Sequence, residues 1–170
     1  MSRPLTVAWT GHRPDVFADP TSAQATVEST ARLLVANDNA SHFLVGGQRG
    51  VDTWAALAAR ALGIPFTVIL PLPAHVFADE RWTAADRTVL EDLLASAETV
   101  TIVGGARDQA FAERNRRLAT ADDLLVAVWT GTPGGGTQET IVLARTVGTP
   151  VREIVVRPSS DAHAKQGRGI

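Results

Sequence analysis

The chain has 170 residues, a length that predicts one domain built around a single core. Its 45% hydrophobic content suits a globular protein, and its formal net charge of −2 gives no general attraction to nucleic acid or to a membrane surface. The sequence contains no cysteine, which excludes disulfides and thiolate metal sites. No apolar stretch matches a signal-peptide core or a membrane span, so we expect a cytoplasmic protein without a membrane partner.

Apolar runs and helical patterns alternate along the chain. The runs predict strands over residues 5–9, 43–45, 66–70, 100–103, 124–129 and 151–156. The patterns between them predict helices over about 21–37, 51–62, 83–95, 108–120 and 141–147. We expect residues 74–82 to form an irregular polar loop. The single domain is expected to cover residues 1–157, followed by a flexible polar tail over 158–170.

This alternation predicts an α/β fold with a mostly parallel sheet and helices on both faces. Glycine-rich turns follow the first, second, fourth and fifth predicted strands. In such folds these turns gather at the carboxyl edge of the sheet, where ligands bind.

The segment 124–140 combines a buried strand, a glycine-rich turn and a helix. Its continuous apolar run is typical of a strand covered on both faces. The glycines let the backbone approach a ligand, and the first amides of the following helix favour an anion. Thr137 can cap that helix, and Glu139 places a carboxylate one turn inside it. We interpret the segment as a phosphate site rather than a plain connector, although its spacing is neither that of a P-loop nor that of a dinucleotide-binding fingerprint. The glycines are Gly134, Gly135 and Gly136.

Two further turns supply candidate ligand-binding residues. After the first strand, Arg13 is a better ligand than His12, which is equally consistent with an exposed loop histidine. After the second strand, Arg49 can bind a phosphate or carboxylate bidentately, while Asp52 is also suited to cap the next helix. The complete candidate set in these turns is Thr10, Gly11, His12, Arg13, Gly46, Gly47, Arg49, Gly50 and Asp52.

Side chains on helices and loops add weaker signals. Of three arginines on the helix over 108–120, we expect two to be solvated, and Asn115 beside Arg114 can hydrogen-bond a ribose or base. Trp54 and Trp129 are expected to fill the core, whereas Trp82, in the polar loop, is the best candidate for stacking on a base. The histidines show no metal-ligand spacing, so we expect neither a metal nor another cofactor.

Four segments in this order resemble the SLOG superfamily (SMF/DprA and Lonely Guy proteins), particularly its stand-alone YpsA/YspA-like branch. They are Thr10-Gly11-His12-Arg13-Pro14, Gly46-Gly47 with Gly50-Val51-Asp52, Arg114-Asn115, and Gly135-Gly136-Thr137. The similarity covers about residues 5–156. It implies a Rossmann-like, doubly wound fold that binds nucleotides or nucleotide-derived ligands. Analogy with relatives also implies a homo-oligomer, as a dimer or a larger assembly.

The residues from Glu113 to Asn115, with those from Pro133 to Glu139, also resemble the Lonely Guy phosphoribohydrolases. Those enzymes cleave the N-glycosidic bond of a nucleoside 5′-monophosphate. The resemblance implies that Arg114 orients or neutralises the substrate. It gives Glu139 the role of stabilising the oxocarbenium-like transition state or activating water. The family's Pro-Gly-Gly-x-Gly-Thr-x-Glu-Glu pattern is one residue shorter here, Thr140 replaces its second glutamate, and Asn115 stands where a lysine is usual.

The segment from Gly46 to Asp52 resembles the corresponding segment of DprA, which binds single-stranded DNA. Such binding requires a basic groove and stacking aromatics, whereas this chain is acidic with 5% aromatic residues. We therefore predict a nucleotide-binding sensor or ligand-binding module and expect no nucleic-acid partner. The phosphate would lie on the 134–137 backbone and the nucleoside between the first two turns. Hydrolysis of the N-glycosidic bond and single-stranded DNA binding are the alternatives.

Overall fold

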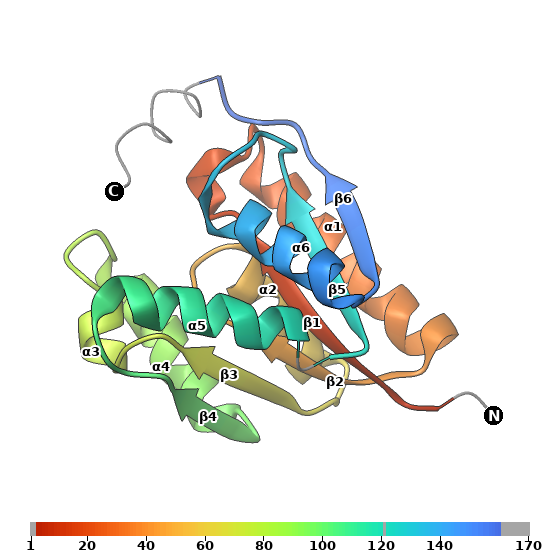
Figure 1. Cartoon of the computed structure of the whole chain (residues 1–170), viewed down its shortest axis with the longest axis horizontal. Coiled ribbons are helices and arrows are strands. Elements are labelled where there is room, and N and C mark those ends of the chain that lie inside the picture. Colours follow the sequence, from red (N-terminus) through yellow and green to blue (C-terminus); the bar gives the residue numbers. More distant parts are fainter. Residues whose placement is uncertain (1–2, 121, 161–170) are drawn as a thin grey trace.

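The computed structural model describes residues 3–120 and 122–160 as one sheet covered by helices (Figure 1). The strands are β1 (Leu5–Gly11), β2 (Ala40–Val45), β3 (Phe66–Leu70), β4 (Thr99–Ile102), β5 (Leu124–Trp129) and β6 (Val151–Val155). The helices are η1 (Pro14–Val16), α1 (Pro20–Asp38), α2 (Val51–Ala61), α3 (Ala74–Phe77), α4 (Ala84–Ser96), α5 (Arg107–Thr120) and α6 (Gly135–Val147). The α/β fold expected from the sequence is confirmed. In this part of the chain no helix has both the length and the apolarity to cross a membrane.

All strand pairs are parallel, in the order β4-β3-β2-β1-β5-β6. The chain builds outward from β1 to β4, then returns to the other side of β1 to place β5 and β6. Helices α5 and α6 cover one face, whereas α1, α2 and α4 cover the other (Figure 1). The sheet is therefore doubly wound, and its winding reverses between β1 and β5. A crevice at the carboxyl ends of the strands is expected at such a reversal.

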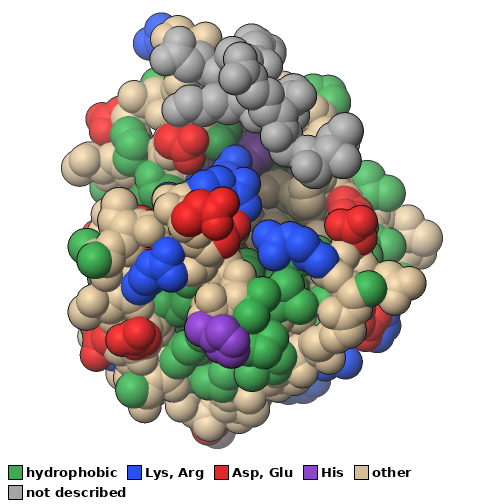
Figure 2. Space-filling model, turned by 90° about the vertical axis from the view of Figure 1, so that its left-hand side faces the viewer, with side chains coloured by type: hydrophobic (Ala, Val, Ile, Leu, Met, Phe, Trp, Pro, Cys, Tyr) green, Lys and Arg blue, Asp and Glu red, His purple; other side chains and the backbone are tan. Residues whose placement is uncertain are grey.

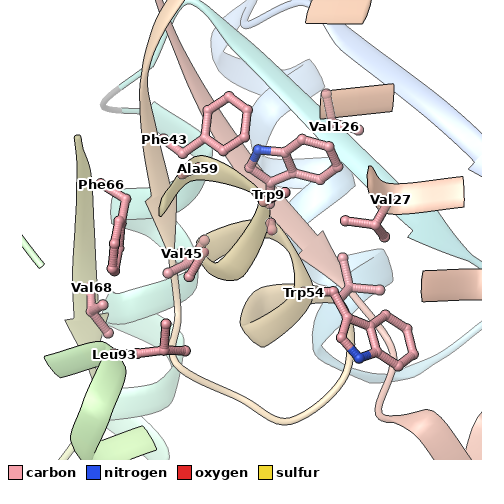
Figure 3. Close-up of a cluster of buried hydrophobic side chains, with 14 of the residues drawn as sticks. Trp9, Val27, Phe43, Val45, Trp54, Ala59, Phe66, Val68, Leu93 and Val126 are labelled. Atoms are coloured by element: carbon pink, nitrogen blue, oxygen red, sulfur yellow. The ribbon is translucent and has the colours of Figure 1, made fainter. Parts of the chain in front are cut away.

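The main core lies between the sheet and helices α1, α2 and α4 (Figure 3). Trp9 of β1 is fully buried there, and its ring centroid lies 5.2 Å from that of Phe43 on β2. A second, smaller cluster under α5 and α6 contains Leu125 and Ile141. Every residue of β5 is buried, because helices cover both of its faces. The predicted two-sided burial of this strand is confirmed.

Local capping residues explain where several helices begin and end. The Asp19 carboxylate accepts hydrogen bonds from the first amides of α1, and Thr83 and Asp86 form a reciprocal capping box at the start of α4. Helix α1 ends at Asp38, and the next residue, Asn39, adopts a left-handed conformation with φ 57°. The observed ends of α1 and α4 lie within one residue of those predicted.

The prediction of an irregular loop over 74–82 was wrong. This segment begins with the short helix α3, in which Phe77 is buried while Val76 stays exposed. Phe77 and Trp82 are both buried, and their rings meet edge to face at 5.5 Å. The polar composition of the segment suggested an exposed loop, so the burial of these two aromatic side chains was not predicted. The predicted tail over 158–170 lies outside the described residues from 161 onward, while Pro158 forms an antiparallel bridge with Phe17.

Neighbouring leucines on α1 provide a matched test of the core. Leu34 is fully buried, whereas Leu33 is 57% exposed. We expect Leu34→Ala to lower the free energy of unfolding by about 2–5 kcal/mol, because it removes buried methyl groups and leaves a cavity. The control Leu33→Ala is expected to change it by less than about 0.5 kcal/mol. Urea denaturation followed by circular dichroism measures both values, and similar values for the two variants would contradict the packing of α1.

Candidate functional site

A cavity of about 570 Å³ lies where the winding of the sheet reverses. The turns after β1, β2 and β5 line it, together with the residues after β3 and the inner side of α5. The predicted site residues in its lining are Thr10, Gly11, His12, Arg13, Arg49, Asp52, Arg114, Asn115, Gly134, Gly135, Gly136 and Thr137. The other predicted residues, Gly46, Gly47, Gly50 and Glu139, are not in the lining. The structure thus brings together segments that lie far apart in the sequence.

Arg114 is a buried cation at the centre of this arrangement. Its Nη1 donates to the Gly46 carbonyl at 2.6 Å, and its Nε donates to Asn115 Oδ1 at 2.9 Å. A Cβ on Gly46 would lie 2.3 Å from Arg114 Nη1, so only glycine leaves room for the guanidinium. Burial lowers the pKa of Arg114, while the carboxylates of Asp52 and Glu139 raise it. Gly46 therefore leaves space for the Arg114 side chain and accepts a hydrogen bond from it.

Two further arginines of α5, near its C-terminal end, are solvated as predicted. Arg116 and Arg117 both pair with Glu113 on the outer side of the helix. These exposed ion pairs hold the pKa of Glu113 at about 2. Two of the three arginines are thus solvated, and Arg114 alone of the three turns into the cavity.

Asp52 faces Arg114 from the first turn of α2. Its Oδ2 accepts a hydrogen bond from the Gln48 amide at 3.1 Å, which closes the turn after β2. Burial raises the pKa of Asp52 to about 6, even though Arg114 and the amides of Gln48 and Gly46 oppose that shift. The predicted capping role was wrong, because Gly50 precedes α2 and no side chain caps it. Asp52 instead closes the preceding turn and lies in the cavity wall.

His12 lies in the cavity wall rather than on an exposed loop. Its Nε2 lies 3.3 Å from Thr130 Oγ1, and its ring packs beside Phe17 and Trp129. Burial, with a smaller contribution from Arg13, lowers the pKa of His12 to about 4. The imidazole is therefore neutral at pH 7 and adds no positive charge to the site.

Behind the lining, the turn after β2 packs on its neighbours. Gly47 faces Leu70, and Gly50 lies against the His12 carbonyl. The Val51 amide donates to that carbonyl at 3.3 Å. These contacts fix the turns after β1 and β2 to each other.

The α6 start differs from the prediction. The helix begins at Gly135 and is preceded by Gly134, whose φ of 103° is readily adopted by glycine. Thr137 is therefore the buried third residue of the helix and not its cap. The Gly134 amide donates to Gln138 Oε1 at 2.6 Å, so the protein satisfies this amide itself. The next amides have no carbonyl four residues earlier in the helix, and they remain suited to an anion.

Glu139 is exposed and stands beside the cavity. Its Oε2 lies 3.5 Å from Asn115 Nδ2, at the limit of a hydrogen bond. Asn115 therefore connects this carboxylate to Arg114.

Sequence reasoning missed the wall formed by residues after β3 and by the first turns of α5. Arg81 and Arg107 lie there with Phe77 and Phe111. Trp82 also lines the cavity, but it is packed on Phe77 and under Arg49, whose guanidinium lies 5.3 Å from the ring centroid. Figure 2 views the side toward which β3 and β4 point, where basic and acidic side chains lie next to each other above a group of hydrophobic ones. The arginines carried no local motif, and only folding brings them to the cavity.

The described part of the chain contains no group of three or more His, Asp or Glu side chains placed to hold a metal ion.

No family model matches the sequence, and no curated protein matches it significantly. Solved structures do match. DNA processing protein A (DprA) from Streptococcus pneumoniae aligns with a TM-score of 0.68 and 21% identity, over 98% of this chain and 56% of that one. The molybdenum cofactor carrier protein from Chlamydomonas reinhardtii aligns with a TM-score of 0.59 and 20% identity, over 89% and 76% of the two chains. The protein TM1055 aligns with a TM-score of 0.58 and 20% identity, over 86% and 71%.

The chain shares the fold of these proteins. It spans a little more than half of the DprA chain that it matches. At these identities the likeness establishes the Rossmann-like fold that the sequence resemblance implied.

The raised pKa of Asp52 gives a testable pH dependence. The carboxyl carbon of Asp52 is expected to titrate in the folded protein with a midpoint near pH 6, instead of the usual 3.8. Because folding favours its protonated form, its contribution to stability is largest below about pH 4 and falls as the pH rises to about 6. Carbon-13 NMR measures the midpoint, and Asp52→Asn assigns the signal. A midpoint at or below 3.8 would show that the Arg114 charge outweighs burial.

Proposed function

We propose that this chain is a SLOG-type domain that binds a nucleotide or nucleotide-derived ligand in this cavity, as a sensor or ligand-binding module. The observation that carries the proposal is the convergence of three separate turns and the α6 start on one cavity at the reversal of the sheet. Its volume of about 570 Å³ lies within the range of small-molecule sites. Membership of the YpsA/YspA-like branch and self-association stay predictions.

The lining favours an anion although the whole chain is acidic. Five arginines and two aspartates line the cavity. The arginines are Arg13, Arg49, Arg81, Arg107 and Arg114, and the aspartates are Asp52 and Asp108. Arg13 has no ion-pair partner among the described residues, so its charge is available to a ligand. The α6 dipole adds positive potential at Gly135 and Gly136. We place the phosphate there and the nucleoside between the turns after β1 and β2.

The aromatic rings of the cavity favour a small ligand over a nucleic acid strand. The names of the structural neighbours do not decide between the two, since one is a cofactor carrier and another a DNA processing protein. DNA binding would need aromatic rings free to stack on bases. Phe77 and Trp82 are only 2% and 7% exposed, and the half-buried Phe111 lies beside the guanidinium groups of Arg107 and Arg114. Single-stranded DNA binding therefore has less support from this cavity.

Hydrolysis of an N-glycosidic bond is the second candidate function. The connection from Arg114 through Asn115 to Glu139 favours it, because it joins the two side chains that the Lonely Guy resemblance makes catalytic. Arg114, however, is already bound to Gly46, and Glu139 stands outside the lining. Binding without turnover accounts better for these positions.

The phosphate site can be tested with nucleoside 5′-monophosphates and the matching nucleosides by isothermal titration calorimetry. We expect the monophosphates to bind at least about tenfold more tightly, because charge-assisted hydrogen bonds to the phosphate are lost in the nucleoside. Arg13→Gln should weaken monophosphate binding by about tenfold, because it removes from the cavity a positive charge that has no ion-pair partner among the described residues. Arg116→Gln, on the outer side of α5, is the matched control and should leave the affinity for the monophosphates unchanged. Equal affinities for nucleosides and nucleotides would contradict the proposal.

Turnover is tested by incubating the protein with each nucleoside 5′-monophosphate and measuring free base by chromatography. A binding module should return the nucleotide intact. Base release that is lost in Glu139→Gln but kept in Glu113→Gln would favour the hydrolase instead, since Glu113 pairs with arginines away from the cavity.

A further inference from the structure

The cavity is long enough for more than one phosphate. At one end, Gly136 of α6 lies beside Asn115, because a Cβ on Gly136 would be 3.3 Å from Asn115 Nδ2. At the other end, Arg107 opens α5, and both Arg107 and Asn115 line the cavity. These two residues are eight positions apart on one helix, which corresponds to about 12 Å along its axis. The α6 phosphate site and Arg107 are thus separated by about two helical turns.

Three arginines gather at the Arg107 end. Arg81 donates to the Asp79 carboxylate through Nη2 at 2.7 Å and through Nε at 3.2 Å, while Arg107 Nη2 lies 3.8 Å from the same carboxylate. The side chains of Arg81 and Arg107 are 61% and 49% exposed. One carboxylate therefore serves two guanidinium groups that remain accessible from the cavity.

Arg49 adds a buried donor to this end. Its guanidinium stacks on Trp82, and its Nη1 lies 3.7 Å from Asp86 Oδ2. Its Nε is buried and has no hydrogen-bond partner among the described residues. The side chain as a whole is 21% exposed and lines the cavity, so its guanidinium adds positive charge to this end.

We propose that Arg49, Arg81 and Arg107 form a second anion subsite, and that the ligand carries a second phosphate or carboxylate remote from its first phosphate. This inference rests on the proposed function, which places the first phosphate at α6. The two phosphates of a diphosphate share an oxygen atom, so they are too close together to occupy both ends of the cavity. The ligand class is therefore a nucleotide with anionic groups on two separate parts of the molecule.

Asp79 has a specific role in this arrangement, as an internal anion that a ligand must displace or share. Hydrogen bonds from Arg81 hold the pKa of Asp79 at about 2, so the carboxylate is ionised at all ordinary pH values. Removing its charge leaves Arg81 and Arg107 free for an external anion.

Inorganic phosphate is a suitable probe because it needs no knowledge of the base. Titration of the nitrogen-15-labelled full chain at low ionic strength should shift two separate sets of amide signals. One set belongs to residues 135–137 and the other to residues 81–82 and 107–108. Shifts at 135–137 alone would overturn the second subsite and leave the proposed function standing. Shifts at 107–108 alone would overturn the phosphate site at α6 and, with it, the two-anion ligand.

Single substitutions distinguish phosphate binding at the two ends of the cavity. Arg107→Gln should lower the phosphate affinity measured from the second set of signals by about tenfold and leave the affinity measured from the first set unchanged. Arg116→Gln on the same helix is the control and should change neither. Asp79→Asn should raise the phosphate affinity measured from the second set of signals by about fivefold at low salt, because it removes a negative charge that competes with phosphate. Unchanged affinity at the second set in both Arg107→Gln and Asp79→Asn would overturn the proposal, even if either variant is less stable.

A nucleic acid strand also carries separated phosphates, and an oligothymidylate titration distinguishes it. The small-ligand proposal expects inorganic phosphate to shift both sets by itself. Shifts at both ends with the oligonucleotide, at concentrations where phosphate produces none, would assign the arginines to a strand and overturn the proposal.

Discussion

The burial of the Arg114 guanidinium is the constraint on which the rest of the site depends. A buried cation is costly unless hydrogen bonds and an opposite charge compensate it. The carbonyl of Gly46 and the side chain of Asn115 supply the hydrogen bonds, and Asp52 is the carboxylate that raises its pKa most. These groups come from the turn after β2, from α5 and from α2. The hydrogen bonds and the opposite charge that compensate this one side chain therefore fix the relative positions of three segments around the cavity.

The same backbone serves the fold and the site. The sheet reverses its winding at β1 and β5, which leaves a space at their carboxyl ends that no crossover helix fills. The turns that border this space must also hold each other in place. The Val51 amide, for example, bonds to the His12 carbonyl, and Gln138 binds the Gly134 amide. A ligand at this position uses the groups that remain, namely the next α6 amides and the arginine side chains.

Carboxylates beside the cavity compensate several of its arginines. The lining can therefore hold five arginines although the whole chain has a net negative charge. Asp52 compensates Arg114, and Asp79 compensates Arg81 and Arg107. The proposed second anion would compete with Asp79 for the guanidinium groups of Arg81 and Arg107. Such competition makes the affinity depend on ionic strength and on the number of anionic groups.

The sequence by itself determined the six strands, the presence of the five longer helices and three of the turns that line the cavity. The two-sided burial of β5 and the glycine turns followed from local patterns, which report burial and backbone freedom over a few residues. Only the tertiary structure decided which charges enter the cavity. Arg114 has the same chemistry as Arg116, yet Gly46, 68 positions away, makes room for one of them. Arg81 and Arg107, 26 positions apart, both lie beside the Asp79 carboxylate at the same end of the cavity. No local sequence pattern predicts these contacts between distant side chains, because the contacts depend on how strands far apart in the sequence are placed in one sheet.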